Sequence, residues 1–283
     1  MSPGTGQVER RAPTLAGVDR GEGPAVVLLH GQPGTSADWS AVVPLLADRF
    51  RVLAPDRPGY GRTAGPAAGF AGNAEAVLAH LDRAGVGRAV VAGHSWGGGV
   101  ALRLAALAPD RVAGLVLAAS VGADTPTPLD RVLALPPLGD LLVAAALVGT
   151  GRALSVPAVR RRLRGRLPPA RSTALEALLR AGDGGRRSSP AWRSFAVEQR
   201  AFVAEAAGLA AGLPGIACPA EVVVGAADRV VTPVAARRLA AAIPAARLVE
   251  LPGVGHLLPH DAPHALARAV TGAARRAGLL GAG

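Results

Sequence analysis

Short apolar runs alternate along this chain with longer stretches in which apolar residues recur every three or four positions. The runs, each typical of a buried strand, are 25–29, 51–55, 89–92, 112–119, 220–224 and 247–251. The stretches with helical periodicity are 39–47, 71–84, 99–108, 233–242 and 262–277. A fainter edge strand is expected at 14–18. The alternation predicts an α/β fold in which a mostly parallel sheet carries helices on both faces.

The alternation stops near Val121 and resumes near Cys218. The interval is rich in Pro and Arg, and its periodicity is helical at 129–148, 170–181 and 191–211. We therefore predict a helical cap over residues 124–215, inserted into a core built from residues 1–123 and 216–283. Open α/β sheets bind ligands at the carboxyl ends of their strands, where such a cap would exclude water and shape a pocket.

Composition favours an ordinary globular domain. The chain has 283 residues, of which 50% are hydrophobic, and its net charge of +11 is carried wholly by Arg. Several Arg gather in the insertion, at 160, 161, 162, 164 and 166. Aromatic residues make up only 3% of the chain, so no stacking surface accompanies this cluster. We interpret it as a solvated helix face and expect no nucleic-acid partner.

Membrane association and secretion are not expected either. The longest unbroken apolar run, 141–148, has eight residues, far fewer than the roughly 18 that span a bilayer. The first 24 residues carry several charges and no apolar segment of the kind found in signal peptides. A single cysteine, Cys218, excludes an internal disulfide and agrees with a reducing compartment. We expect a cytoplasmic protein with no metal, and the sequence does not indicate an oligomeric state.

The most informative stretch is 90–100, where an apolar run ends in Gly93-His94-Ser95-Trp96-Gly97 and a helical pattern follows. A GxSxG motif between a strand and a helix is typical of a nucleophile elbow, in which small flanking residues allow a cramped backbone turn. The alternative is a plain glycine-rich turn with a surface serine. The elbow hypothesis makes Ser95 a candidate nucleophile.

A serine hydroxyl needs a general base, and the base needs an orienting acid. Among six histidines, His256 follows the last expected strand in a loop, whereas His94, beside Ser95, is interpreted as structural. Asp228 lies in the turn after the preceding strand and would share that sheet edge. Asp124 is an alternative acid, and Asp228 could instead cap the following helix. The order Ser95, Asp228, His256 is one of the known orders of a serine triad.

An oxyanion that develops during acyl transfer needs two prearranged N–H donors. The backbone N–H of Trp96, the residue after the candidate nucleophile, is one candidate. The second should come from the loop after strand 25–29, which reads His-Gly-Gln-Pro-Gly at 30–34. Pro33 has no N–H, which leaves the backbone N–H of Gln32 as the expected donor.

Five motifs in order resemble the α/β-hydrolase superfamily and span nearly the whole chain. They are HGQPG at 30–34, DRPGYGR at 56–62, GHSWGG at 93–98, GAAD at 225–228 and GH at 255–256. The resemblance implies an eight-stranded, mostly parallel sheet with a helical cap and an active site without a cofactor. It also implies that Ser95, Asp228 and His256 form the catalytic triad.

Two branches of that superfamily are excluded by the residues themselves. Its epoxide hydrolases and haloalkane dehalogenases use an aspartate nucleophile, and the elbow here holds Ser95. Epoxide hydrolases also use cap tyrosines, but the only tyrosine, Tyr60, lies outside the expected cap. An ester, a thioester, an amide or a carbon–carbon bond next to a carbonyl remains, because each gives an acyl intermediate on Ser95. We predict a hydrolase that cleaves a carboxylic ester, or a related acyl bond, of a small molecule through that intermediate.

Several features of the cap leave alternatives open. The aromatic residues Trp192, Phe195 and Phe202 are candidates to line the pocket, although their near-helical spacing also fits core packing. Glu198 and Glu205 could bind a substrate amine, as in the similar proline iminopeptidases, but both are interpreted as surface residues. Two other functions compete: a non-hydrolytic enzyme on the same scaffold, such as a lyase, a perhydrolase or a cofactor-free oxygenase, and a non-catalytic ligand-binding protein.

Overall fold

A computed structural model describes residues 13–123, 126–164 and 190–280. Its described strands form one seven-stranded sheet in the order β1-β3-β2-β4-β5-β6-β7. Their bounds are β1 Gly17–Arg20, β2 Ala25–Leu29, β3 Arg51–Pro55, β4 Ala89–His94, β5 Val112–Ala118, β6 Ala220–Gly225 and β7 Ala246–Leu251. Every pairing is parallel except that of β1 with β3. The mostly parallel α/β fold is confirmed, with seven described strands where the resemblance implied eight.

Burial along the strands explains why the apolar runs located them so closely. All residues of β2, β4, β5 and β6 are buried, because helices cover both faces of the sheet. Strand β7 lies at the edge and alternates between partly buried and exposed positions. The expected and observed bounds agree least well for β1, which begins at Gly17 and not at residue 14. It is a four-residue edge strand, and its burial is only partial.

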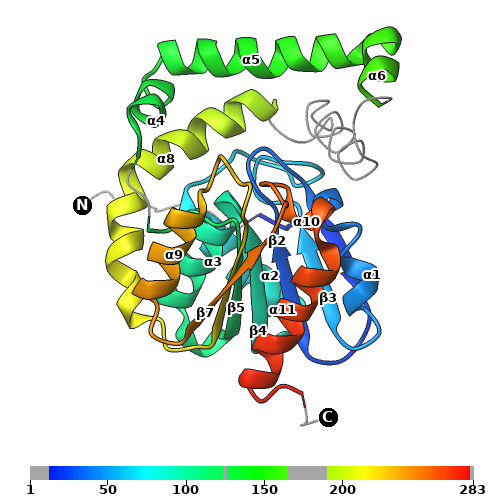
Figure 1. The fold of residues 1–283 in the computed structure, drawn as a ribbon, viewed down its shortest axis with the longest axis vertical. Helices are drawn as coiled ribbons and strands as arrows, with labels where there is room; N and C mark the ends of the chain where they lie inside the picture. The colour runs from blue at the N-terminus through cyan, green and yellow to red at the C-terminus, as the bar shows by residue number, and fades with distance from the viewer. Residues whose placement is uncertain (1–12, 124–125, 165–189, 281–283) are drawn as a thin grey trace, which may run out of the picture.

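Two layers of helices enclose the sheet (Figure 1). One layer consists of α2 Phe70–Arg83, α3 Trp96–Leu107 and α9 Pro233–Ala242. The other consists of α1 Val43–Leu46 and α11 Pro263–Arg276, which crosses in front of the sheet in Figure 1. Three short elements complete the core: the 3-10 helices η1 Ser36–Trp39 and η2 Pro109–Arg111, and α10 Leu258–Asp261.

One expected helix is broken near a proline, and another is confirmed almost to the residue. The helix expected at 39–47 is replaced by the last residue of η1 and by the single turn α1, which begins at Val43 and has Pro44 in its first two positions. The helix expected at 262–277 is confirmed as α11, which begins at Pro263 and ends at Arg276, after the separate turn α10. Proline is favoured at the first helical position because its missing N–H would have no helical partner there.

The insertion between β5 and β6 is helical throughout its described part. It contains α4 Pro128–Leu133, α5 Leu138–Ser155, α6 Pro157–Arg164, α8 Ala191–Gly212 and the 3-10 helix η3 Leu213–Gly215. The single helix expected at 129–148 is split between α4 and α5 by Pro136 and Pro137, since proline interrupts a helix. The helix expected at 170–181 lies outside the described residues.

The helix α8 connects the insertion to the core. It packs under α5, which runs along the top of the molecule in Figure 1. Farther along α8, Phe202, Ala206 and Leu209 are buried in the same cluster as α2 and α3. One end of α8 therefore belongs to the cap and the other to the hydrophobic core.

Candidate active site

Ser95 occupies a strained turn between β4, which ends at His94, and α3, which begins at Trp96. Its φ of 53° and ψ of −119° are unusual for a residue with a side chain. The neighbouring glycines make this turn sterically possible, because a Cβ on Gly93 would overlap the backbone of Gly97, and one on Gly97 the carbonyl of Leu29. The fold thus holds the Ser95 side chain at the carboxyl edge of the sheet.

Three side chains that are distant in sequence meet at this edge. His256 Nε2 lies 3.1 Å from Ser95 Oγ, and His256 Nδ1 lies 2.9 Å from Asp228 Oδ2. A carboxylate oxygen only accepts hydrogen bonds, so Nδ1 carries the proton and donates it to Asp228. The lone pair of Nε2 then faces the Ser95 hydroxyl. This arrangement allows His256 to remove the hydroxyl proton as Ser95 attacks a carbonyl carbon.

Asp228 is held rigidly in its orienting position. It is 4% exposed, and its Oδ1 accepts the backbone N–H groups of Val230 at 2.8 Å and Val231 at 3.1 Å. Its other oxygen is left to His256. The cap of α9 is Thr232, whose hydroxyl accepts the N–H of Ala235, so the helix-cap interpretation of Asp228 is wrong. Asp124, the alternative acid, lies outside the described residues.

The two expected oxyanion donors flank the nucleophile. Trp96 is the first residue of α3, so its N–H has no partner within the helix. The loop that contains Gln32 packs against the elbow, since a Cβ on Gly31 would lie 3.3 Å from Ser95 Cβ. The Gln32 side chain anchors this loop to the cap by donating from Nε2 to the Phe195 carbonyl at 2.9 Å.

His94 supports the loop that carries the base. Its Nε2 donates to the His256 carbonyl at 2.8 Å, and the two imidazole centroids are 5.0 Å apart. Burial, reinforced by the neighbouring His256, lowers the pKa of His94 to about 3. His94 therefore remains neutral near pH 7 and positions the backbone of His256.

Ser95 and His256 open into a small cavity of about 100 Å³. The other lining residues come from the Gln32 loop, from η1, from the end of β4 and from the segment after β7: Gly31, Gln32, Pro33, Asp38, His94, Leu257, Pro259 and His260. Pockets for drug-sized ligands usually measure roughly 300–1,000 Å³. The volume bounded by these described residues matches a small group beside the nucleophile.

None of the three candidate pocket aromatics is among the residues that line this cavity. Phe202 packs edge-on against Phe70 with ring centroids 6.5 Å apart and belongs to the core. Phe195 contributes only its carbonyl, to Gln32. The Trp192 ring lies near the guanidinium of its neighbour Arg193. Core packing, the alternative interpretation of the spacing, describes Phe202.

Asp38 is a cavity residue that sequence reasoning missed. It comes from η1 and shares the cavity with Ser95 and His256. Burial raises the pKa of Asp38 to about 7, although the Thr35 backbone and Arg57 act in the opposite direction. No motif marks this position, because its closeness to Ser95 depends on how η1 packs. The same is true of His260 in α10.

A buried ion pair joins the cap to the core behind the oxyanion loop. Arg57 and Glu198 are both fully buried and form a close ion pair, and Tyr60 Oη donates to Glu198 Oε2 at 2.7 Å. Arg57 also donates to the carbonyls of His30 and Gly31, each at 2.9 Å. The guanidinium carbon lies 4.7 Å from the Trp96 ring centre. Arg57 thus contacts α8 of the cap and both sides of the expected oxyanion site.

These contacts correct the interpretation of Glu198 as a surface residue. A lone buried carboxylate would be costly, and Arg57 and Tyr60 compensate for that cost. Burial nevertheless raises the pKa of Glu198 above its usual range. Glu205 is half-buried and accepts the N–H of Ala71 at the start of α2. Neither carboxylate lines the cavity beside Ser95.

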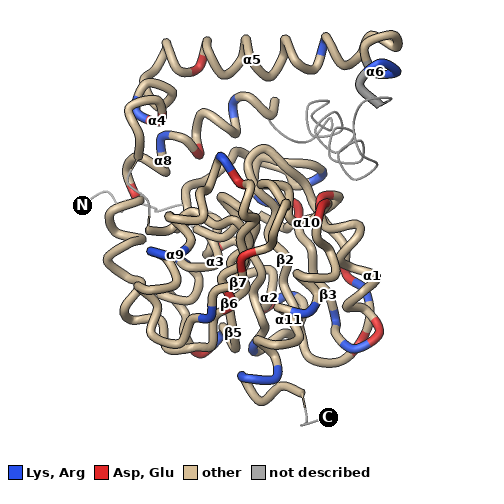
Figure 2. Tube along the Cα trace, in the orientation of Figure 1, with Lys and Arg blue, Asp and Glu red and all other residues tan. Residues whose placement is uncertain are grey.

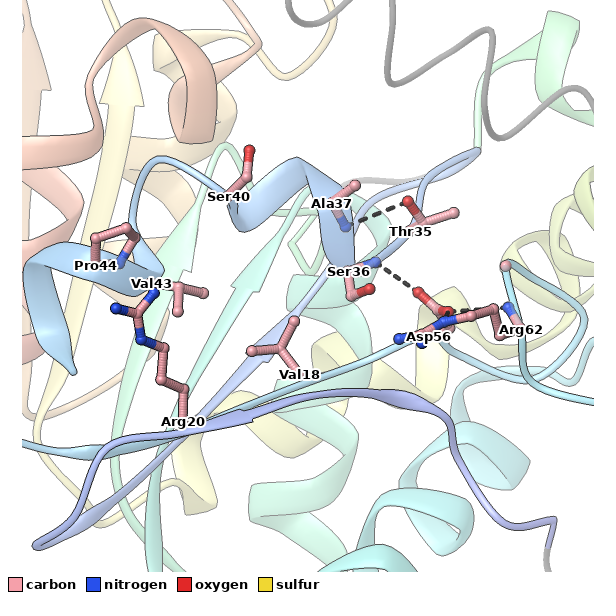
Figure 3. Close-up of a pocket in the computed structure, with 11 residues that line it drawn as sticks. Val18, Arg20, Thr35, Ser36, Ala37, Ser40, Val43, Pro44, Asp56 and Arg62 are labelled. Carbon is pink, nitrogen blue, oxygen red and sulfur yellow. Dashed lines mark hydrogen bonds and ion pairs between the residues drawn. The ribbon is translucent and has the colours of Figure 1, made fainter.

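A second, larger hollow of about 530 Å³ lies beside β1 and η1. Figure 3 shows Asp56 at one side of it, accepting the N–H groups of Ser36 at 2.7 Å and Arg62 at 2.9 Å. The Asp56 carboxylate is thereby committed to holding two loops together. None of the expected site residues lines this hollow. No group of three or more His, Cys, Asp or Glu suited to a metal is found among the described residues.

Comparison with known proteins agrees with the fold. The family model described as alpha/beta hydrolase fold matches residues 24–263. An uncharacterized protein of Mycobacterium tuberculosis is 31% identical over 281 residues, covering 90% of this chain and 75% of that protein. Haloalkane dehalogenase 2 of the same species is 36% identical over 104 residues, covering 35% of this chain and 36% of the dehalogenase.

Two solved structures are similar over nearly their whole length. A thermophilic esterase from Thermogutta terrifontis superposes with a TM-score of 0.72 at 25% identity, covering 93% of each chain. The enol-lactonase from Burkholderia xenovorans LB400 has a TM-score of 0.70 at 25% identity, covering 91% of this chain and 95% of its own. With the family match over residues 24–263, these findings show that the chain belongs to the α/β-hydrolase fold family.

Proposed function

We propose that this protein hydrolyses a carboxylic ester of a small molecule through an acyl-enzyme intermediate on Ser95. The observation that carries the proposal is the continuous hydrogen-bonded array from Ser95 Oγ through His256 to Asp228, at 3.1 and 2.9 Å. A strained serine on an elbow, a base with its lone pair free and a buried orienting carboxylate are the components of nucleophilic acyl transfer.

The reaction begins when Ser95 Oγ attacks the ester carbonyl carbon while His256 Nε2 takes the hydroxyl proton. The carbonyl oxygen becomes an oxyanion that accepts the backbone N–H groups of Gln32 and Trp96. His256 then protonates the departing alkoxide, which leaves as an alcohol and leaves the acyl group on Ser95. Asp228 stabilises the imidazolium in both steps.

Water completes the cycle. His256 removes a proton from a water molecule as its oxygen attacks the acyl carbon, and a second oxyanion forms in the same place. Its collapse breaks the bond to Ser95 Oγ, which regains its proton from His256. A carboxylic acid is released, and Ser95 and His256 return to their starting protonation states.

A serine nucleophile does not fit the dehalogenation of haloalkanes or the opening of epoxides, which are reactions of some members of this family. If Ser95 displaced a halide or opened an epoxide, it would become an alkyl ether. An ether has no carbonyl carbon for water to attack, so the enzyme would be trapped after one turnover. An aspartate nucleophile forms an ester instead, which water can cleave. Ser95 therefore favours acyl substrates over haloalkanes and epoxides.

Recognition of a substrate amine receives no support from the cap carboxylates. Glu198 is engaged by Arg57 and Tyr60, and Glu205 caps α2. The small cavity beside Ser95 favours a short acyl group. We accordingly propose esters of short acids as the first substrates to test.

The experiment combines active-site labelling with a substrate series. Purified protein is treated with a fluorophosphonate probe and assayed on p-nitrophenyl acetate, butyrate and octanoate, with Ser95→Ala as the matched control. We expect labelling of the wild type alone and faster turnover of the acetate and butyrate. Labelling without turnover of any ester would instead favour non-hydrolytic chemistry at Ser95. Full esterase activity in Ser95→Ala would refute the mechanism, and an unreactive Ser95 would favour a binding protein.

A further inference from the structure

Exposed aliphatic side chains are concentrated on the outer helices of the insertion. Nine of the fourteen exposed Leu and Val side chains in the described residues fall between 129 and 159. Leu129, Leu135 and Leu141 expose 64%, 54% and 68% of their surface. Scattered exposed aliphatic residues are ordinary, whereas a contiguous group of them marks an interaction surface. We call the outward surface of α4, α5 and α6 the outer cap face.

The helix α5 forms the centre of this face. It has 18 residues with a mean hydropathy of 1.3, and only 17% of it is buried, so by length and composition it could cross a bilayer. The length of the longest unbroken apolar run, 141–148, does not reveal this property, because Gly149, Thr150 and Gly151 end the run inside the helix. Val143 and Leu154 are nonetheless buried, and Asp140 pairs with Arg200 of α8 at 2.7 Å. A helix tied to the protein in this way can lie on a membrane rather than span it.

The exposed charged side chains on the described part of the outer cap face have one sign. Arg131, Arg152, Arg161 and Arg162 are exposed, and Figure 2 shows basic positions on α4, α5 and α6. The two acids between residues 126 and 164 are half-buried and engaged: Asp140 pairs with Arg200, and Asp130 closes the capping box of α4 and accepts from Gln199. The described part of the face therefore presents leucine, valine and arginine to its surroundings.

We propose that the outer cap face binds the surface of an anionic phospholipid bilayer. Leu138, Leu141 and Leu142 would enter the boundary between headgroups and acyl chains, while the arginines meet lipid phosphates. A second copy of the chain fits less well. In a two-fold interface the patch meets itself, which brings arginines together without an exposed acid among the described residues of α4, α5 and α6 to pair with them. The proposal replaces the expectation of no membrane partner and does not depend on ester hydrolysis.

Vesicle flotation with the full chain tests this surface. Vesicles of phosphatidylcholine alone and of phosphatidylcholine with phosphatidylglycerol at a 7:3 ratio are compared at low and high salt. We expect at least tenfold stronger partitioning into the anionic vesicles and a marked weakening in high salt, because exposed charges are screened. Ser95→Ala should bind as the wild type does, which separates this result from that of the esterase assay.

Matched variants distinguish the outer cap face from the rest of the surface. Leu141→Asp/Leu142→Asp and, separately, Arg161→Glu/Arg162→Glu should each reduce partitioning at least tenfold. The same changes on the core, Leu45→Asp/Leu107→Asp and Arg103→Glu/Arg238→Glu, should leave it within about twofold of the wild type, since those side chains are exposed elsewhere. Thermal unfolding monitored by circular dichroism verifies that each variant is folded.

Three outcomes would overturn the proposal. The first is that the folded wild type does not float with anionic vesicles at low salt. The second is an equal loss of flotation in the cap and core variants, which would indicate a general charge effect. The third is a dimer at micromolar concentration in sedimentation velocity that Leu141→Asp/Leu142→Asp converts to a monomer. In that case the outer cap face is an interface between copies of the chain.

Discussion

In the proposed reaction, the orientation of one imidazole ring determines whether Ser95 can act as the nucleophile. His256 presents the lone pair of Nε2 to the serine because Nδ1 donates to Asp228, and Asp228 is held by two backbone N–H groups. Removing the negative charge of Asp228 while keeping its shape should therefore disturb the tautomer of His256 rather than the fold.

Asp228→Asn tests this dependence. An asparagine that donates to Nδ1 would turn the proton of the imidazole toward Ser95, so that His256 could no longer act as the base. We expect kcat to fall by about 10³–10⁴-fold with little change in KM, by analogy with the loss seen when a triad aspartate is amidated. Steady-state assays on a p-nitrophenyl ester measure the effect. A decrease of less than tenfold would indicate a different acid.

The ionisation of Asp38, in the cavity beside Ser95, should make the stability of the protein depend on pH. Its pKa is raised by burial to about 7 from an ordinary value of 3.8, so the unfolded chain releases the proton at lower pH than the folded chain. Between these values the folded state binds more protons, and the contribution of Asp38 to stability falls as the pH rises.

Asp38→Asn should consequently stabilise the protein more at pH 8 than at pH 5, by a difference of about 2 kcal/mol. Urea unfolding of the wild type and the variant at both pH values gives this difference directly. Glu75→Gln, on the exposed face of α2, is a matched amide substitution that should show no such pH-dependent gain. An equal effect of Asp38→Asn at both pH values would mean that Asp38 ionises normally.

At the scale of elements, α8 joins the insertion to the loop that precedes Gln32. Its Glu198 reaches Arg57, which in turn donates to the carbonyls of His30 and Gly31. Cutting a buried ion pair leaves a buried charge without a partner, which typically costs about 3–5 kcal/mol. The position of the loop expected to supply the Gln32 oxyanion donor should therefore depend on a residue of the cap.

Glu198→Ala should lower the free energy of unfolding by about 3 kcal/mol and reduce kcat more than it raises KM. Glu205→Ala, on the same helix but half-buried, is the control and should have a smaller effect on both. Arg57→Met/Glu198→Leu separates the two effects. It should recover most of the stability but not kcat, because the loop carbonyls lose their donor. Full recovery of kcat would show that the pair serves stability alone.

Proline and capping chemistry explain where the expected and observed elements differ. The apolar pattern locates the central strands to within two residues, because buried parallel strands are apolar along their whole length. It merges α4 with α5 and η1 with α1, since periodicity continues across the prolines that end these helices. The spacing of hydrophobic residues reflects which positions are buried. That spacing hardly changes where one helix ends and the next begins in a new direction.

On the scale of the whole molecule, stability should decrease from the centre of the sheet outwards. Strands β4 and β5 have partners on both sides and are buried on both faces, whereas β1 and β7 are edges with partly exposed residues. Outside the sheet, α5 is mostly exposed and packs mainly on other helices of the insertion. Its local unfolding should require less free energy than that of the core.

Hydrogen exchange followed by mass spectrometry checks this gradient. Amides of β4 and β5 should exchange slowest, those of β7 earlier and those of α5 and α6 earliest. Anionic vesicles should slow exchange in α5 and α6 without changing β4, which would agree with the proposed membrane contact. Exchange in α5 as slow as in β4 would mean that the insertion and the core open as one cooperative unit.

The sequence by itself determined the order of strands and helices, the elbow at Ser95 and the candidates Asp228 and His256, because each depends on local periodicity or on a short motif beside a strand end. Only the tertiary structure decided which side chains surround the nucleophile. It brought Asp38 into the cavity, turned Phe202 into the core and paired Arg57 with Glu198, 141 positions away in sequence. Such contacts depend on how helices pack on the sheet. The order of residue types along the chain does not indicate which distant residues this packing will bring together.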